Sequence, residues 1–199
     1  MAFCVGLTGG IGSGKSAAAS LFGKLGAAIV DTDEISHQLT APGGDALPEL
    51  TRQFGAASIS ASGGLDRARM RDLVFRDATA REKLEAILHP MIRERTRAGI
   101  ATARAPYVIV VVPLLFETGA HLDIVKRVVV VDCDEGTQIR RVVARSGIAA
   151  DEVRRIMAAQ LPRAERVKRA DDVLDNNGDL EALKPQVARL HDRYLALAA

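Results

Sequence analysis

The chain is poor in the residue types that staple small or secreted domains. Its 199 residues include no tryptophan, two cysteines and four histidines, and aromatic residues make up 4%. Cys4 and Cys133 both lie in apolar segments, so we expect buried, reduced thiols rather than a disulfide or a metal pair. No set of histidines and cysteines has the spacing of a zinc site. These scarcities disfavour a disulfide scaffold and a zinc domain, and they favour a cytoplasmic setting.

Long hydrophobic runs and a strong charge excess are also missing. No apolar run approaches the length of a membrane span, and the chain enters a strand-like run without a basic leader segment. The formal net charge is +2, and no basic surface interleaved with aromatic residues is visible. We therefore expect neither a membrane nor a nucleic-acid partner. What is present is 48% hydrophobic residues, ample for the core of one domain.

The most informative motif occupies residues 9–16 and reads G-x-x-x-x-G-K-[ST]. It follows an apolar run at residues 3–7 and precedes a helical pattern, which is the context of a phosphate-binding P-loop. Lys15 can reach the β- and γ-phosphates of a nucleotide, and Ser16 can complete the oxygen shell of its Mg²⁺. The residues expected to contact ATP here are Gly10, Ile11, Gly12, Ser13, Gly14, Lys15, Ser16 and Ala17.

The hydrophobic pattern predicts an α/β fold. Apolar runs without alternation, typical of parallel strands covered on both faces, occur at residues 4–7, 27–30, 107–112, 128–131 and 173–174. Helical patterns lie between and after them, at residues 67–75, 79–88, 91–102, 136–145, 150–160 and 180–197. We expect a three-layer α/β/α P-loop NTPase fold with a parallel sheet.

The connection between the second and third strands is too long for a simple crossover. We expect a single P-loop kinase domain whose core comprises residues 1–34, 105–138 and 170–199. Residues 35–104 are expected to form an inserted helical subdomain that binds the substrate. Residues 139–169 are expected to form a lid that can hinge at Gly147.

Two carboxylates, Asp31 and Asp33, follow the second strand at the edge where α/β proteins bind ligands. Strand alternation would point them in the same direction. One carboxylate can accept the proton of an attacking hydroxyl, and another can hold water on Mg²⁺. An alternative is that Asp33 caps a helix beginning at Glu34, which does not exclude catalysis.

Two further segments permit both a functional and a structural interpretation. Leu114 and Glu117 follow the third strand, where the apolar turn after Pro113 is equally well explained by core packing. Arg141 and Arg145 share a helix face, so they either face solvent or present two guanidiniums to a polyphosphate.

Two single residues are also ambiguous. His89, next to Pro90, is more typical of a partly buried structural histidine than of a catalyst. Asn176 lies in the turn after the last strand, which is either a plain turn or a loop that touches adenine.

Taken in order over almost the whole chain, these motifs resemble the dephospho-CoA kinase family, which phosphorylates the 3′-hydroxyl of the dephospho-CoA ribose. The resemblance rests on LTGGIGSGK (7–15), VDTDEI (30–35), FG (54–55), LDR (65–67), VF (74–75), LEAILHP (84–90), PLLFE (113–117), Q-x-x-R-x-x-x-R (138–145), QLP (160–162), AD (170–171) and DN (175–176). It implies ATP and dephospho-CoA as small-molecule partners, with Mg²⁺, and a monomer or weak homo-oligomer.

The resemblance also implies roles for individual residues. Asp33 is implied as general base, and Lys15 and Arg141 as catalytic cations. The implied acceptor contacts are Thr8, Asp33, His89, Leu114 and Glu117; the further nucleotide contacts are Arg141, Arg145 and Asn176; the metal contacts are Ser16 and Asp31. Ala149 departs from the family pattern, which often has a helix-capping serine there.

Two other functions share part of the pattern. A nucleoside or shikimate kinase would not explain the long insertion at residues 35–104 or the PLLFE segment. A regulatory nucleotide switch would need a guanine-reading N-K-x-D motif, whereas residues 132–134 after the fourth strand read Asp-Cys-Asp.

Overall fold

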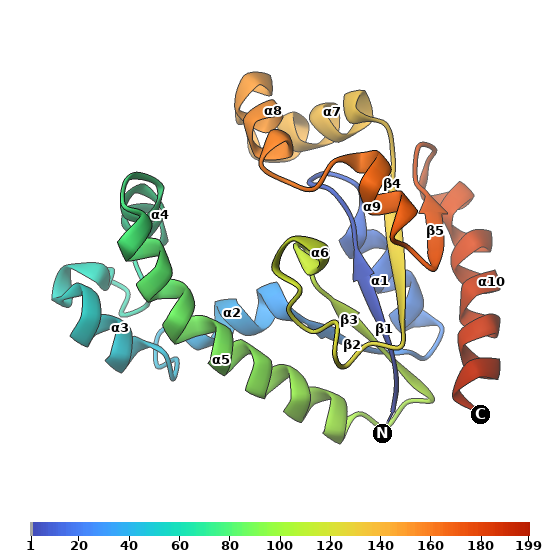
Figure 1. Ribbon diagram of the computed structural model, residues 1–199, viewed down its shortest axis with the longest axis horizontal. Coiled ribbons are helices and arrows are strands. Elements are labelled where there is room, and N and C mark those ends of the chain that lie inside the picture. The colour runs from blue at the N-terminus through green and yellow to red at the C-terminus, as the bar shows by residue number, and fades with distance from the viewer. Residues whose placement is uncertain (1) are drawn as a thin grey trace. The chain divides into compact units, whose positions relative to one another are not determined.

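The computed structural model describes residues 2–199, which form two compact units. The first unit comprises residues 2–31 and 100–199, and the second comprises Thr32–Gly99. Figure 1 labels the helices and strands of both units. Within residues 2–199, no helix combines the length and the apolar character needed to cross a bilayer.

A five-stranded parallel sheet is the framework of the first unit, with the order β2-β3-β1-β4-β5. The strands are β1 (Phe3–Thr8), β2 (Ala28–Asp31), β3 (Tyr107–Val111), β4 (Arg127–Asp132) and β5 (Asp172–Asp175). All five predicted strands are confirmed. Because the strands are parallel, their carboxyl ends meet at one edge, and the central strand β1 leads into the P-loop there.

The main core of this unit lies between the sheet and two helices. α1 (Lys15–Lys24) and α10 (Leu180–Ala198) pack against each other and against the strands, and Figure 1 shows α10 beside β5. Tyr194 of α10 is fully buried, stacks on Phe22 at a ring-centroid distance of 5.9 Å, and meets Tyr107 edge-on at 5.7 Å. These aromatic contacts fix the closing helix on the sheet.

Segments from the second half of the chain cover the other face of the sheet. A Cβ on Gly6 would lie 2.9 Å from Leu115, so α6 (Leu115–Thr118) packs closely on β1 where that strand carries no side chain. α9 (Arg163–Lys168) packs on β4. Helices on both faces complete the predicted three-layer α/β/α arrangement.

Two further helices stand between β4 and α9, namely α7 (Glu135–Ser146) and α8 (Ala150–Ala158). The carboxylate of Asp134 caps α7 by accepting from Thr137 N at 2.8 Å, and hydrogen bonding, first of all from the Thr137 hydroxyl, lowers the pKa of Asp134. Gly147 ends α7 in the left-handed conformation, at φ 67°. α8 starts after Ala149 without a side-chain cap.

The second unit consists of helices around a small core. Its elements are α2 (Thr32–Thr40), α3 (Leu47–Phe54), the 3-10 helix η1 (Ala56–Ser58), α4 (Arg67–Arg76) and α5 (Ala78–Thr102). Leu39, Ala46 and Leu50 are buried at its centre, and partly buried residues of α5 such as Leu84 and Met91 pack on them.

The two helices predicted at residues 79–88 and 91–102 are one helix. α5 runs without a break through Pro90. Proline inside a helix removes one hydrogen bond and costs about 3 kcal/mol, which usually breaks the helix. Here Leu84 and Leu88 before the proline and Met91 and Ile92 after it pack on the same core cluster, so tertiary packing holds both halves together.

Both cysteines are buried and free, as the sequence predicts. Burial is the main cause that raises the pKa of each thiol, Cys4 and Cys133. A raised pKa keeps a thiol protonated at neutral pH, so neither cysteine is a reactive nucleophile.

A buried carboxylate ties the edge strand β5 to its neighbours. The Asp172 side chain is 3% exposed and accepts from Arg127 Nε at 3.0 Å, from Arg193 Nη1 at 2.8 Å and from the Tyr194 hydroxyl at 3.0 Å. The carboxylate therefore joins β4, β5 and α10. Burial, and after it the Asp172 charge, raises the pKa of Tyr194.

Replacing this carboxylate tests the network. We expect Asp172→Ala to lower the free energy of unfolding by about 3 kcal/mol, the low end for a broken buried ion pair, because Arg193 can turn into solvent. Asp151→Ala, which removes an 87% exposed partner of a surface pair, is the control and should change stability by less than about 0.5 kcal/mol. Urea denaturation measures both variants, and similar losses would contradict the network's role.

Candidate active site

The P-loop, residues 9–16, joins β1 to α1 at the carboxyl edge of the sheet. Gly12 and Gly14 have φ angles of 72° and 97°, conformations that glycine adopts without strain. α1 begins at Lys15, directly after Gly14. The loop therefore combines backbone N–H groups with the positive end of a helix, which is the arrangement that binds phosphate.

The side chain of Lys15 folds back onto the first two glycines of the loop. Lys15 Nζ donates to the carbonyls of Gly9 at 2.9 Å and Gly10 at 3.0 Å. Ser16 is exposed in the first turn of α1, so its hydroxyl can reach a bound ligand. The two polar side chains that the motif predicts for nucleotide and metal thus stand at the same end of the helix.

Asn176 attaches the end of β5 to the loop. Its side chain is buried, and its Nδ2 donates to Ser13 O at 2.7 Å, while its backbone N donates to Asp132 O at 2.7 Å. A Cβ on Gly14 would lie 2.0 Å from this Nδ2. Asn176 therefore shapes the loop directly, a role that neither of the two sequence-based alternatives, a plain turn or an adenine contact, includes.

The two predicted lid arginines have different environments. Arg141 Nη1 donates to Asn176 O at 2.9 Å and its Nη2 donates to Gly178 O at 3.0 Å. Arg145, one turn later on α7, is exposed, and its Nε lies 3.5 Å from the Ser146 hydroxyl. The structure brings Arg141 to the turn that supports the loop, and it leaves Arg145 on an exposed surface.

Two glutamines bond the backbone of Ile11, one at its N–H group and one at its carbonyl. Ile11 N donates to Gln160 Oε1 at 3.1 Å, and Gln138 Nε2 donates to Ile11 O at 3.0 Å. Both glutamines lie in motifs that carry the family resemblance, but the sequence predicts a site role for neither of them. Gln138 is 4% exposed, but no local pattern marks it, because only Val142 among its neighbours three and four residues away on the helix is apolar.

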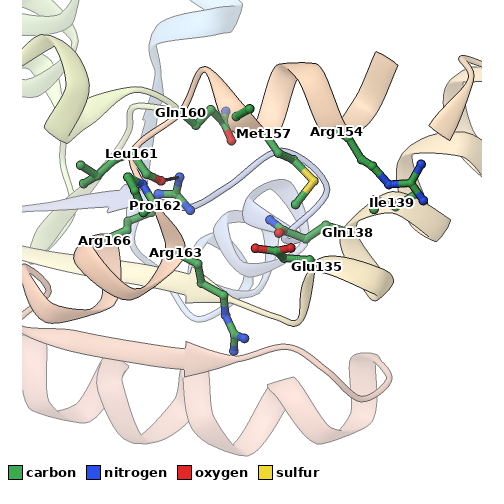
Figure 2. Close-up of a pocket in the computed structure, with 11 residues that line it drawn as sticks. Glu135, Gln138, Ile139, Arg154, Met157, Gln160, Leu161, Pro162, Arg163 and Arg166 are labelled. Atoms are coloured by element: carbon green, nitrogen blue, oxygen red, sulfur yellow. Dashed lines mark hydrogen bonds between the residues drawn. The ribbon is translucent and has the colours of Figure 1, made fainter. Parts of the chain in front are cut away.

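A pocket of about 400 Å³ lies beside the loop rather than over it. Figure 2 shows the side chains of its lining, which come from α7, α8, α9 and the segment between the last two. Its lining residues are Glu135, Gln138, Ile139, Arg154, Met157, Ala158, Gln160, Leu161, Pro162, Arg163 and Arg166. The P-loop, which carries the phosphate donors, still marks the candidate active site.

The residues expected near the acceptor are spread over several elements. Thr8 is buried, and its hydroxyl donates to Pro113 O at 3.2 Å. Leu114 is 41% exposed. Glu117 Oε1 accepts from Leu161 N at 2.9 Å. His89 is exposed on α5 of the second unit, so the alternative of a partly buried structural histidine is wrong.

The two predicted acids do not share a strand. β2 ends at Asp31, and α2 begins at Thr32, so Asp33 is exposed in the first turn of a helix. The expectation that strand alternation aligns the two side chains is therefore wrong. The alternative that Asp33 caps a helix starting at Glu34 is also wrong, because Asp33 lies inside the helix. A carboxylate in the first turn is stabilised by the helix dipole.

The oxygen donors present suit an ion that a nucleotide carries. Within residues 2–199, no group of three or more His, Cys, Asp or Glu side chains can hold a metal on its own. Mg²⁺ keeps waters and phosphate oxygens and needs few protein ligands. Ser16 stands at the P-loop, which follows β1, and Asp31 ends β2. These two strands are two positions apart in the sheet, which separates them by about 10 Å at a strand spacing of about 4.8 Å.

Comparison with known proteins gives a consistent result. A family model described as dephospho-CoA kinase matches residues 3–182. The dephospho-CoA kinase of Nitrosospira multiformis is 56% identical over 194 residues, covering 98% of this chain and 97% of that protein. The corresponding protein of Bordetella pertussis is 54% identical over 196 residues, with coverages of 98% and 92%.

Solved structures share the fold of this chain. TT1252 from Thermus thermophilus has a TM-score of 0.84 and 34% identity, covering 96% of this chain and 97% of that chain. Dephospho-CoA kinase from Campylobacter jejuni has a TM-score of 0.70 and 21% identity over 98% of both chains. Shikimate kinase from Aquifex aeolicus has a TM-score of 0.54 at 17% identity, over 99% of this chain and 100% of that one, which shows a shared fold alone.

The contact between Gly14 and Asn176 can be tested with a matched pair of glycine variants. Gly14→Ala adds a Cβ where Asn176 stands, whereas Gly26→Ala meets nothing within 4 Å although its φ of 104° is just as unusual. Because both variants carry similar backbone strain, only Gly14→Ala should distort the loop. We expect its affinity for ADP to fall at least about tenfold, roughly 1.4 kcal/mol. Calorimetric titration with ADP measures this, and equal affinities for the two variants would contradict the role of the contact.

Proposed function

This chain belongs to the dephospho-CoA kinase family and is a kinase, and on that premise we propose that it phosphorylates the 3′-hydroxyl of the dephospho-CoA ribose with ATP, giving coenzyme A and ADP. The observation that carries the proposal is the family match over residues 3–182, which begins at the strand leading into the P-loop. The shikimate kinase alternative rests on the shared fold alone.

In the proposed reaction the triphosphate of ATP lies on the P-loop. The backbone N–H groups and the positive end of α1 bind its oxygens, and Lys15 exchanges its present carbonyl partners for phosphate. Asn176 bonds the carbonyl of Ser13, and Arg141 bonds the carbonyls of Asn176 and Gly178, so both residues help to keep the loop in this shape. Mg²⁺, held through Ser16 and, by way of water, Asp31, would neutralise charge on the β- and γ-phosphates.

We propose Asp33 as the general base. Only Thr32 stands between it and Asp31 at the carboxyl end of β2, so chain connectivity keeps the two Cα atoms within about 7 Å. The acceptor oxygen attacks the γ-phosphorus, the bond from that phosphorus to the β–γ bridging oxygen breaks, and Asp33 takes the hydroxyl proton. ADP is the leaving group.

The remaining acceptor residues divide into two proposed roles. Leu114 and His89 are exposed, and we propose them as direct contacts of dephospho-CoA. Thr8 and Glu117 are engaged by Pro113 and Leu161, so they support the segments at the edge of the site. The helices of Thr32–Gly99 are proposed to bind the acceptor. A cytoplasmic location and a monomeric or weakly associating state stay predictions.

The proposed function is tested by an ADP-release assay with MgATP. Dephospho-CoA should support turnover, whereas shikimate, adenosine and a no-acceptor control should give only background hydrolysis. The product should be heavier by one phosphate, and phosphorus NMR should place that phosphate on the 3′-oxygen. Turnover with shikimate or adenosine in place of dephospho-CoA would overturn the acceptor assignment and leave a P-loop kinase of another specificity.

The role of Asp33 is tested by Asp33→Asn, which keeps the shape of the side chain and removes its basicity. We expect kcat to fall by about 10²-fold or more, the usual scale for a lost general base, with ADP affinity unchanged. Glu34→Gln is the control, because Glu34 is an exposed acid in the same helical turn. Saturating turnover measures both, and a parental rate in Asp33→Asn would remove Asp33 as the base.

A further inference from the structure

The environment of Arg166 is unusual for an arginine. Arg166 lies on α9 and is 6% exposed. Among the arginines of residues 2–199, it is the one whose side chain is buried. Its Nη2 donates to Leu161 O at 2.6 Å. The carboxylate oxygen that pairs with Arg166, Glu117 Oε1, lies 3.7 Å from Nη2 and already accepts a hydrogen bond from Leu161 N. The buried Nε has no hydrogen-bond partner in the described part of the chain.

This incompletely compensated cation lies against the P-loop. A Cβ on Gly10 would be 3.0 Å from Arg166 Nη1, so the guanidinium packs on the backbone of that glycine. Lys15 Nζ donates to Gly10 O at 3.0 Å. Two cations therefore flank one loop residue, where burial strengthens the repulsion between them. An anion bound at Gly10 would remove the repulsion and could accept a hydrogen bond from Arg166 Nη1, the nitrogen that lies against this glycine.

We propose that Arg166 binds the phosphoryl group during its transfer and acts with Lys15 as the second catalytic cation. The inference rests on the proposed function, because it names a residue of the same phosphoryl-transfer site. It assigns to Arg166 the role that sequence reasoning gave to Arg141 and Arg145.

The other arginines of this region have different partners. Arg141 is bonded to two carbonyls at the end of β5, and Arg145 is exposed. Arg163 forms a bidentate pair with Asp132, at 2.8 and 2.7 Å, and this pair raises the pKa of the Arg163 guanidinium. Arg166 thus combines burial, an unsatisfied donor and contact with the loop.

The segment before α9 orients the guanidinium. Gln160 Oε1 accepts from Ile11 N, Leu161 N donates to Glu117, and Leu161 O accepts from Arg166. Figure 2 shows Arg166 beside Leu161, at the end of the pocket opposite Arg154. Because the guanidinium is planar and one nitrogen is fixed by Leu161, the directions of its other donors are fixed as well. A preset donor of this kind stabilises developing charge without reorganisation.

The test replaces Arg166 by methionine, which has a similar length and no charge. We expect Arg166→Met to lower kcat for dephospho-CoA about 10²- to 10³-fold, as for loss of a transition-state charge partner. Its ADP affinity should change less than about threefold, since ADP lacks the transferred group. Its melting temperature without nucleotide should be equal to or higher than the parent's, because an incompletely paired buried charge is removed.

The matched control is Arg169→Met at the residue that directly follows α9, where the side chain is exposed. It should keep kcat, ADP affinity and melting temperature. Arg166→Lys restores the charge without the planar fork, so its kcat should lie between those of the parent and Arg166→Met. If Arg166→Met fails to fold, Arg166→Lys carries the test with the same three measurements.

Binding of ADP with aluminium fluoride, which mimics the phosphoryl group in transfer, separates this inference from the acceptor assignment. The parent should bind this mixture more tightly than ADP alone, and Arg166→Met should lose most of that gain, whichever acceptor proves correct. An undiminished gain in Arg166→Met overturns the role of Arg166. A parallel fall of melting temperature, ADP affinity and turnover would show a structural role and also overturn it. Failure of the parent to use dephospho-CoA would refute the proposed function alone.

Discussion

The shape of the P-loop depends on one constraint, which is that four of its carbonyl groups take donors from side chains. An N–H group that points toward an anion cannot also satisfy a carbonyl of the loop. The structure supplies the donors from side chains. Lys15 serves Gly9 and Gly10, Gln138 serves Ile11, and Asn176 serves Ser13. The loop keeps its shape because these four carbonyls are bonded.

This requirement explains why the sheet order matters to the site. Gln138 comes from the helix after β4 and Asn176 from the turn after β5, and both strands end at the same edge as β1. The two donors are 38 residues apart in sequence, 138 to 176, yet both reach the loop. Gly10 and Gly14 leave room for them, since a Cβ on either would meet the donor amide at 2.3 or 2.0 Å. Glycine is needed here as much for close approach as for backbone freedom.

Local patterns in the sequence predict the parts of this structure that local forces decide. Continuous apolar runs predicted all five strands, the spacing of glycines and Lys15 predicted the P-loop, and the ordered motifs along almost the whole chain predicted the family. Packing against distant residues decided the rest. Pro90 should break α5 by its own preference, but the core around Leu50 keeps the helix intact. The pair Asp31 and Asp33 has strand-like spacing, yet the strand ends between them. The burial of Arg166 depends on contacts with Leu161 and Gly10 that no local pattern contains.

The bonds of Lys15 show how the loop can receive a ligand without losing its shape. When a phosphate takes the ammonium, the carbonyl of Gly10 loses one donor, but it still accepts from Ser13 N at 3.1 Å. A carbonyl has two acceptor sites, so the exchange leaves Gly10 satisfied. Gln138 and Asn176 bond the carbonyls of Ile11 and Ser13, which do not depend on Lys15. Gln138 and Asn176 can therefore keep their carbonyl partners while Lys15 exchanges its own for the ligand.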